Sequence, residues 1–498
     1  MSNVSKAAVS SQPLVPLQRL LTIGGIGQHH QQMTIGTLPD DVLLKIFKVF
    51  VDTTYSYYTA SEKWCTLVHV CRRWRDLAFT SPRHLNLQLL CGPPRRSVEE
   101  MLDIWPELPI FIHDFGCPSS EAKDNVAAAL RLNHRVFGIR LDRTSDFAWE
   151  IFAPLMQHSF PALTHLWVQP HLLQRIAISR SFLGGSAPSL RDLRLVSVIF
   201  PALPELLLSS TNLVVLTVHW YNHIPPSGYI SPQAMVTGLS ALTQLESLSL
   251  TFSSPHSLPD RAIRTPPPHT HALLPALTYI HFQGDPEYME DLVAQIDAPS
   301  LESMVITLFH QEVIEVSELA KFVRRTDKLS LLDRAAVVFQ RDSIFVTLSQ
   351  EELEREIGPK TLLLSPACPE SDSRLSYLVL FCASLLPTLF PFECLEIIIF
   401  EPYHDTWKDT MDDPDSQWLK LLHLFNTVKD LRLCEAVAPS IAQALRGVPG
   451  ERVLEVLPAL EMVFISEMEP FGPVKEAISE FADARQLSSH PVSIHDWE

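Results

Sequence analysis

Few residues of this 498-residue chain have the types and the spacing that catalysis or metal binding requires. His219 and His223 stand four residues apart, and on a helix this spacing would let two imidazoles share a zinc ion. His219 directly follows a predicted strand, however, so the helical geometry is missing and we expect no metal site there. G-G-S-A-P at 184–188 lacks the final glycine of a nucleophile elbow. No C-x-x-C, H-E-x-x-H or phosphate-binding loop occurs either, so no cofactor is expected.

Composition narrows the function classes further. A net charge of −18 argues against a nucleic-acid binder and against a protein of anionic membrane surfaces, because both use a basic face. With 39 prolines and only 16 glycines, short elements punctuated by proline are favoured over glycine-rich phosphate cradles. The eight cysteines lie mostly in apolar runs, and no signal peptide is recognised, which predicts free thiols and a cytoplasmic and/or nuclear location. The uncharged run Leu375–Leu386 is expected to be a buried helix that ends before a proline, and no membrane partner is expected.

Apolar residues concentrate in a short stretch from Thr37 to about Leu85. Pro39 and Asp40 suit the first turn of a helix, because proline has a fixed φ and a carboxylate offsets the helix dipole. A second run, with Ser61 as its N-cap, also carries apolar residues at spacings of three and four. Roughly fifty residues are barely enough to bury this much apolar surface internally. We therefore expect the stretch either to pack on the rest of the chain or to bind a partner.

Two segments of this stretch, L-P-D-D-V-L-L-K-I-F and V-C-R-R-W-R-D-L-A, together resemble the F-box. The F-box is a three-helix module that docks on a Skp-type adaptor and so links its carrier to a cullin–RING ubiquitin ligase. The connection that follows Val51 is longer than is usual in that family. Some matching residues must form the small core of the module itself. The resemblance implies that adaptor binding involves residues among Leu38, Pro39, Leu43, Ile46, Phe47, Val70, Cys71, Trp74 and Leu77.

Two alternatives stay open for this stretch. Arg72, Arg73 and Arg75 either meet acidic groups of the adaptor or form a solvated basic turn. The stretch as a whole is either an F-box or a helical hairpin that caps the domain behind it. An exposed apolar face between residues 38 and 77 would indicate a missing partner and so favour the F-box.

From residue 136 onward, one six-residue pattern recurs along the chain. V-F-G-I-R-L at 136–141 is followed by similar segments that begin at 163, 190, 213, 245, 277 and 301, a mean step of 27.5 residues. Three later segments begin at 395, 428 and 460. An L-x-x-L-x-L strand with this period is typical of leucine-rich repeats, in which only stacked neighbours cover the inward side chains. No asparagine ladder accompanies the strands, so the repeats are expected to be irregular.

The predicted fold class is therefore α/β: a short all-α F-box and then an irregular leucine-rich-repeat-like solenoid, with parallel strands on the concave side and helices outside. Within the solenoid we expect a mobile loop at 253–272 and an irregular insertion at 307–394, the latter containing a hairpin. The predicted boundaries are a disordered tail at 1–33, the F-box at 34–85, the solenoid at 86–470, and a C-terminal helix and tail at 471–498.

Strand alternation places the third, fifth and seventh residues of each repeat on the concave side. Because Trp, Tyr and Arg are the usual interface anchors, this side is the candidate surface for a protein substrate. A loop or the C-terminal tail that covers several of these residues is the competing expectation. The candidates are Arg140, His165, Trp167, Asp192, Arg194, His219, Tyr279 and His281.

The arrangement resembles F-box proteins of the large set found in mushroom-forming fungi. That resemblance implies a substrate-recognition subunit of a Skp–cullin–F-box ubiquitin ligase, with an unknown protein substrate and no catalytic residue of its own, since the E2 that the RING subunit recruits transfers ubiquitin. The alternative is a repeat scaffold for protein interaction, with a helical cap and no ligase role. A hydrolase would need a nucleophile and a base close together, and the sequence offers no such pair.

Overall fold

The computed structural model describes residues 35–497 except 53–56, 83–84, 86, 93–96, 106, 115, 117–118, 172–175, 221–227, 253–270, 310–315, 341–342, 351–360, 368–373, 387–388, 390, 400–413 and 467–471. The chain divides into two compact units, one up to Leu87 and one from Gln88 to Glu498. We call them the helical unit and the repeat region. The predicted tail at 1–33 and most of the predicted loop at 253–272 lie outside the described residues.

The described residues of the helical unit form three α-helices: α1 (Asp40–Asp52), α2 (Tyr57–Val70) and α3 (Arg72–Thr80). Helix α2 begins at Tyr57, so Ser61, which was predicted to cap this helix, lies inside it and that prediction is wrong. Cys71 is extended, with φ −159°, and therefore separates α2 from α3. The centre of the unit is formed by the buried side chains of Leu43, Phe47, Trp64, Leu67, Val68 and Ala78.

The repeat region is built on one 16-stranded sheet. Neighbouring strands in this sheet pair in parallel, except that β15 runs against both of its neighbours. In the order of the sheet, the strands are β1 (Leu89–Cys91), β2 (Ile110–Asp114), β3 (Val136–Thr144), β4 (His165–Pro170), β6 (Asp192–Val196), β8 (Val215–Trp220), β9 (Ser247–Phe252), β11 (Tyr279–Gly284), β13 (Ser303–Phe309), β16 (Leu362–Ala367), β15 (Ile344–Ser349), β14 (Arg334–Phe339), β17 (Cys394–Ile399), β18 (Asp430–Leu433), β19 (Met462–Ser466) and β20 (Ser493–Trp497). Two further strand pairs stand apart from it: β5 (Ile176–Ala177) with β7 (Val198–Ile199), and β10 (Ala272–Leu273) with β12 (Ile296–Asp297).

Each of the ten predicted repeat segments coincides with a strand of this sheet. Most of these strands begin two residues into the predicted segment, because the first leucine belongs to a turn. Leu163 N, for example, donates to Phe160 O at 3.1 Å, and the Leu163 side chain is buried under the strand that follows. Along β4 buried and half-buried residues alternate, which is the pattern of a strand with one core face.

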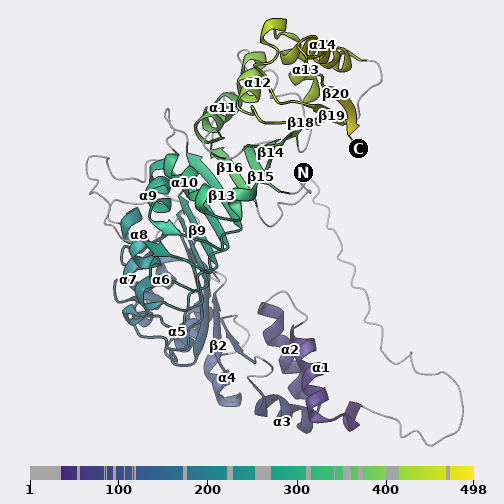
Figure 1. The fold of residues 1–498 in the computed structure, drawn as a ribbon. Coiled ribbons are helices and arrows are strands. Elements are labelled where there is room, and N and C mark those ends of the chain that lie inside the picture. Colours follow the sequence, from purple (N-terminus) through teal and green to yellow (C-terminus); the bar gives the residue numbers. More distant parts are fainter. Residues whose placement is uncertain are drawn as a thin grey trace, which may run out of the picture. The chain divides into compact units, whose positions relative to one another are not determined.

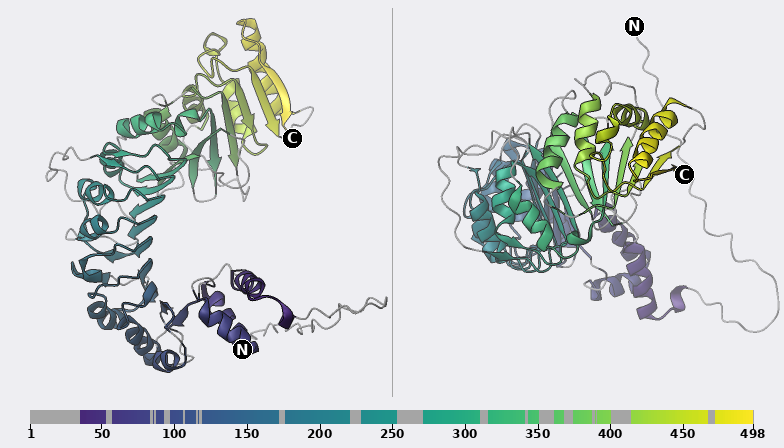
Figure 2. Two further views of the ribbon diagram at one scale, coloured as in Figure 1. Left: turned by 60° about the horizontal axis from the view of Figure 1, so that its bottom comes forward. Right: turned by 45° about the horizontal axis from the view of Figure 1, so that its top comes forward.

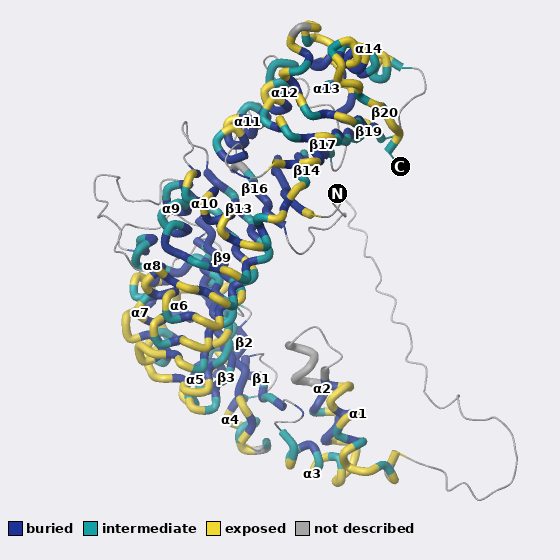
Figure 3. Tube along the Cα trace, in the orientation of Figure 1, coloured by how far each residue is buried: buried dark blue, intermediate teal, exposed yellow. Residues whose placement is uncertain are grey.

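Helices join most of the successive strands of the repeat region. Figures 1 and 2 show these helices along one side of the sheet. Figure 3 shows that the outer turns of these helices carry most of the exposed residues, while the strands are largely buried. The α-helices are α4 (Val98–Ile104), α5 (Ser120–Leu130), α6 (Asp146–Leu155), α7 (Leu203–Ser209), α8 (Pro232–Leu239), α9 (Pro286–Val293), α10 (Ser317–Arg325), α11 (Arg374–Leu385), α12 (Pro414–His423), α13 (Ala438–Arg446) and α14 (Pro473–Leu487).

Helix α11 corresponds to the buried helix predicted at Leu375–Leu386 and has 12 residues. No helix in the described part of the chain has both the length and the apolar character that a membrane span requires.

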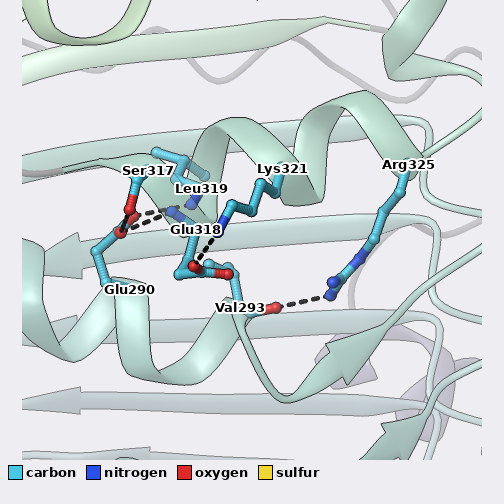
Figure 4. Close-up of polar contacts among 7 residues, drawn as sticks. All are labelled: Glu290, Val293, Ser317, Glu318, Leu319, Lys321 and Arg325. Carbon is cyan, nitrogen blue, oxygen red and sulfur yellow. Dashed lines mark hydrogen bonds and ion pairs between the residues drawn. The ribbon is translucent and has the colours of Figure 1, made fainter. Parts of the chain in front are cut away.

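The junction between α9 and α10 is held by charged side chains at both helix ends (Figure 4). The carboxylate of Glu290 on α9 accepts from the backbone N–H groups of Glu318 and Leu319, at 2.7 and 2.8 Å, and so caps the start of α10. From the last turn of α10, Arg325 reaches back and donates to the carbonyls of Val293 at 2.8 Å and of Ile296. Each helix therefore satisfies backbone groups at an end of the other.

The regular order of strands breaks after β13. Strands β14 and β15 form an antiparallel hairpin, as predicted for this part of the sequence, and β15 then pairs antiparallel with β16. Because β16 returns to pair in parallel with β13, and β14 pairs in parallel with β17, the sheet continues across the insertion without an edge.

The C-terminal residues add a strand to the sheet, whereas only a helix and a tail were predicted there. Helix α14 is followed by β20, which pairs in parallel with β19 and adds one more strand–helix unit beyond residue 470. Arg485 of α14 is fully buried and donates to four backbone carbonyls in the preceding turn, those of Val456, Leu457, Pro458 and Leu460, at 3.0–3.3 Å. Burial lowers the pKa of this guanidinium, but the four carbonyls give it partners in place of water.

We expect Arg485→Met to lower the free energy of unfolding by about 3 kcal/mol, because the four carbonyls would lose a charged donor inside the fold. Urea denaturation followed by circular dichroism measures the change. The matched control is Arg446→Met, which removes an exposed ion pair between Arg446 of α13 and Glu480 of α14 and should leave the unfolding midpoint unchanged. Equal midpoints for the two variants would contradict the role assigned to Arg485.

Candidate functional site

Helix α1 of the helical unit is apolar on two adjacent faces. Leu43 and Phe47 are fully buried, and Phe47 packs against Trp74 with ring centroids 4.7 Å apart. On the neighbouring face, by contrast, Ile46 and Val49 are 40% and 63% exposed. One face therefore builds the core of the unit, and the other presents apolar side chains to its surroundings.

The nine residues predicted to bind an adaptor divide between these two roles. Leu43 and Phe47 belong to the core, and Leu38, Trp74 and Leu77 are half-buried. The remaining four are exposed, namely Pro39, Ile46, Val70 and Cys71. The prediction missed Val49 and Phe50 on α1, which are 63% and 39% exposed. Their spacing from Ile46 was the available signal, because residues three and four apart share a face of a helix.

Two of the three arginines in the basic turn serve the helical unit itself. Arg73 donates to the Asp40 carboxylate at 2.6 Å and to the carbonyl of Leu38, also at 2.6 Å, so it ties α3 to the start of α1. Arg75 donates to the carbonyl of Val68 at 2.9 Å. These contacts give both side chains an internal structural role.

In the repeat region, all eight residues predicted for substrate binding lie on the side of the sheet away from the helices. We call this side, from β3 to β13, the strand face. Cross-strand register aligns its residues in rows. The central row runs through Arg140, Trp167, Arg194, Thr217, Ser249, His281 and Val305. A neighbouring row contains His165, Asp192 and Tyr279, and His219 lies on the other side of the central row. The sequence therefore placed all eight on one surface.

Trp167 lies between two arginines in the central row. The guanidinium carbon of Arg140 is 3.8 Å from the centroid of the Trp167 ring, and that of Arg194 is 5.4 Å away. Each arginine also binds a carboxylate of its own strand: Arg140 pairs with Asp142 at 2.7 Å, and Arg194 donates two hydrogen bonds to Asp192 at 2.9 and 3.1 Å. We call Arg140, Trp167 and Arg194 the cation–π stack.

Asp142, the seventh residue of its repeat, was not among the predicted residues. Its carboxylate also contacts His113 Nε2 at 3.2 Å. Burial by itself raises the pKa of Asp142, but the contacts with His113 and Arg140 outweigh it and hold the pKa below the usual value. Asp142 is therefore ionised at neutral pH and stays a partner for Arg140.

Further along the strand face, Ser249 links two histidines. Its Oγ is 2.9 Å from His219 Nε2 and 3.0 Å from His281 Nδ1, and the two imidazole rings are 6.2 Å apart. Burial lowers the pKa of His281, and it lowers the pKa of His219 to about 4, to which the neighbouring His281 and Arg194 also contribute. Burial also lowers the pKa of His165, so all three of these histidines are neutral at pH 7.

A second group of aromatic residues, which the sequence did not predict, lies on the last strands of the sheet. Arg432 on β18 lies over the rings of Phe464 and Trp497, at 5.4 and 5.7 Å. His495 stacks on Phe464 with centroids 5.4 Å apart. The available signal was the recurrence of D-L-R-L, at 192–195 and at 430–433, which places an arginine at the same position of two repeats.

The histidine pair that was considered for a metal ion is only partly described. His223, which the sequence paired with His219, falls outside the described residues. Among the described residues, no three His, Cys, Asp or Glu side chains cluster in a way that would hold a metal ion. The six described cysteines, at positions 65, 71, 91, 382, 394 and 434, carry free thiols.

The neutral histidines predict a pH dependence of stability. A histidine whose pKa is lower in the folded state binds fewer protons than in the unfolded state, so its contribution is complete above about pH 6.5 and is lost as the pH falls towards 4. From His219 alone we expect a loss of about 2 kcal/mol in unfolding free energy between pH 7.5 and pH 5.

Urea denaturation at the two pH values tests this, with His219→Gln beside the wild type. The pH-dependent part should shrink in His219→Gln and stay unchanged in His158→Gln, which alters an exposed histidine. A pH dependence equal in all three proteins would contradict the assignment.

Comparison with known proteins adds one family match. The family described as F-box-like matches residues 35–84, which are almost the whole described helical unit. No curated protein matches the chain. Among solved structures, the chain is similar to the leucine-rich repeat-containing protein LegL7 from Legionella pneumophila, with 13% identity over 80% of this chain and 97% of that protein and a TM-score of 0.24.

At that TM-score the similarity to LegL7 adds nothing to what the sheet topology shows. The likeness to the F-box set of mushroom-forming fungi stays a prediction. The 27.5-residue period and the parallel strands with helices along one side are those of a leucine-rich-repeat-like solenoid. The chain therefore contains an F-box-like domain at residues 35–84, which is followed by a leucine-rich-repeat-like region.

Proposed function

We propose that this chain is the substrate-recognition subunit of a Skp–cullin–F-box ubiquitin ligase. The F-box-like domain binds a Skp-type adaptor, as F-box domains generally do, and the repeat region binds a protein substrate. The observation that carries the proposal is the apolar surface that the helical unit exposes, namely Ile46, Val49 and Phe50 on α1 and Val70 at the end of α2.

This apolar face is informative because the helical unit already has a complete core. Leu43, Phe47 and Val68 are fully buried, so the exposed side chains are additional to those that fold the unit. Apolar area stabilises an interface by roughly 25 cal/mol per Å² when it is removed from water, whereas in the free chain it promotes aggregation. A partner that covers Ile46 and Val70 would gain this stabilisation and would also prevent the aggregation.

The repeat region supplies the second half of the proposal. Its strand face presents tryptophan, tyrosine and arginine side chains, the residue types that carry most binding energy in protein interfaces. They stand on strands fixed by cross-strand pairing, such as Trp167 between Arg140 and Arg194, so little ordering is needed when a partner binds. A rigid, extended surface of this kind suits a protein substrate.

In this proposal the chain carries out no chemistry. It holds the substrate while the E2 recruited by the RING subunit transfers ubiquitin, and no cofactor takes part. Burial raises the pKa of the Cys91 thiol to about 12, so that thiol stays protonated and unreactive. We propose that the chain acts in the cytoplasm and/or the nucleus, where cysteines such as the six described free ones stay reduced.

The alternative, a repeat scaffold with a helical cap and no ligase role, requires the apolar face of the cap to be covered within the chain. Within the helical unit itself, Ile46 is 40% and Val70 is 59% exposed, so its own described residues do not cover them, and adaptor binding distinguishes the two functions.

The test is adaptor binding by the purified full-length chain. In Ile46→Lys/Val70→Lys, two charges would have to be desolvated at the interface, so we expect at least about a 100-fold loss of affinity for a Skp-type adaptor. Isothermal titration calorimetry, or a pull-down against a dilution series of adaptor, measures it. Both positions are exposed, so the variant should fold normally.

Leu208→Lys is the matched control, because Leu208 is also an exposed apolar residue, at 48%, but lies on α7 of the repeat region. It should bind the adaptor as the wild type does. A well-folded wild type that fails to bind, or a double variant that binds with unchanged affinity, would refute the adaptor role and leave the repeat scaffold.

A further inference from the structure

The charges of the strand face are already paired with one another. From β3 to β13, the residues that cross-strand register aligns in the three rows include two arginines and two aspartates, and no other Asp, Glu, Lys or Arg. Arg140 binds Asp142, and Arg194 binds Asp192. Arg143 is outside these rows, because a bulge in β3 takes it out of register.

This surface is therefore neutral within a chain whose net charge is −18. The histidines do not change the balance at neutral pH, because burial keeps His165, His219 and His281 uncharged. A surface without net charge gives no electrostatic preference for a strongly charged partner, acidic or basic.

A phosphorylated ligand fits this surface poorly. A phosphate group carries about −1.5 to −2 charges and is usually bound by arginines that are available to donate to it. Here Asp192 already accepts two hydrogen bonds from Arg194, so a phosphate on the remaining donors of this guanidinium would lie beside a carboxylate that repels it. The same conflict arises at Arg140 and Asp142.

The exposed features of the strand face suit flat, uncharged groups. The cation–π stack presents planar groups that are only partly buried, with the short side chains of Val215 and Thr217 on the next strand. Beyond them, Tyr279 is 37% exposed. Planar side chains of this kind offer contact area at low entropic cost.

We propose that the strand face recognises an unphosphorylated, uncharged segment of the substrate protein, with an aromatic or proline ring placed against the cation–π stack. The inference rests on the proposed function, since it assumes that the repeat region is the substrate-binding part. It specifies the chemistry of the substrate segment, and it removes any need for a priming phosphorylation.

The experiment uses the full-length chain and two peptide libraries of equal length. One is a random library displayed on phage, which carries no phosphate, and the other is a synthetic library with a fixed central phosphoserine. Peptides enriched from each are measured by fluorescence polarisation. We expect enrichment of uncharged peptides with aromatic residues or proline, and affinities that fall at least about tenfold in Trp167→Ala. A phosphoserine introduced into the same peptides should weaken binding about tenfold or more.

Asp142→Asn/Asp192→Asn is the variant that separates charge from packing, because it keeps the side-chain volumes and releases both arginines from their carboxylates. It should gain affinity for the phosphoserine peptides. Leu208→Lys, on the helical side of the region, should match the wild type with every peptide.

Tighter binding of phosphoserine peptides by the wild type, or the absence of any peptide whose affinity depends on Trp167, would overturn this inference. Adaptor binding is measured on the same samples. Failure there, with the peptide results as expected, refutes the ligase role and leaves the strand face as a binding surface. Normal adaptor binding, together with peptide results that differ from those expected, refutes only this inference.

Discussion

Each strand of the repeat region is stable only because its neighbours cover one of its faces. In β4, Leu166 and Val168 are buried to 1% and 0% exposure, and the Leu163 turn that precedes the strand completes the same core. A single strand–helix step could not bury these side chains alone, so stacking is obligatory. Register between neighbours follows, because a slip by one residue would turn the leucines outward. That register also fixes the outward rows, and with them the candidate binding surface.

Charged side chains also stabilise the repeat region. They form hydrogen bonds with backbone groups that would otherwise lack partners. Beyond β13 the sheet takes in an antiparallel hairpin, and at that junction Glu290 and Arg325 cap the ends of each other's helices. In the turn that precedes β19, Arg485 of α14 donates to four backbone carbonyls. A buried charge is costly unless its donors are used, so these side chains mark where apolar stacking alone does not suffice.

The sequence predicted much of this fold because its main signal is periodic. Ten segments with the same leucine spacing could not be placed other than as stacked strands, and the alternation within them identified all eight candidate residues as outward. The prediction failed where it depended on a single residue, or where a helix is apolar on two faces. A residue such as Ser61 looks like a helix cap in isolation, but α2 continues through it. Helix α1 is apolar on two adjacent faces, and periodicity does not tell which of them, that of Phe47 or that of Ile46, is the core. Strand β20 reads S-I-H-D-W and lacks the leucine pattern of the other strands, so it was assigned to a tail.

The two occurrences of D-L-R-L show why a motif alone does not determine a surface. At 192–194 the arginine lies beside Trp167 and donates twice to its own aspartate, so its charge is cancelled within the strand. At 430–432 the cross-strand neighbours are instead Glu396 and Phe464, and Arg432 lies over Phe464 and Trp497. The same four residues thus place an arginine over a ring of the preceding strand in one repeat and over rings of the two following strands in the other. The difference comes from what the adjacent strands place in register, so the binding chemistry of the repeat region is set by pairs across strands. A prediction of its ligands must therefore start from the register of the sheet.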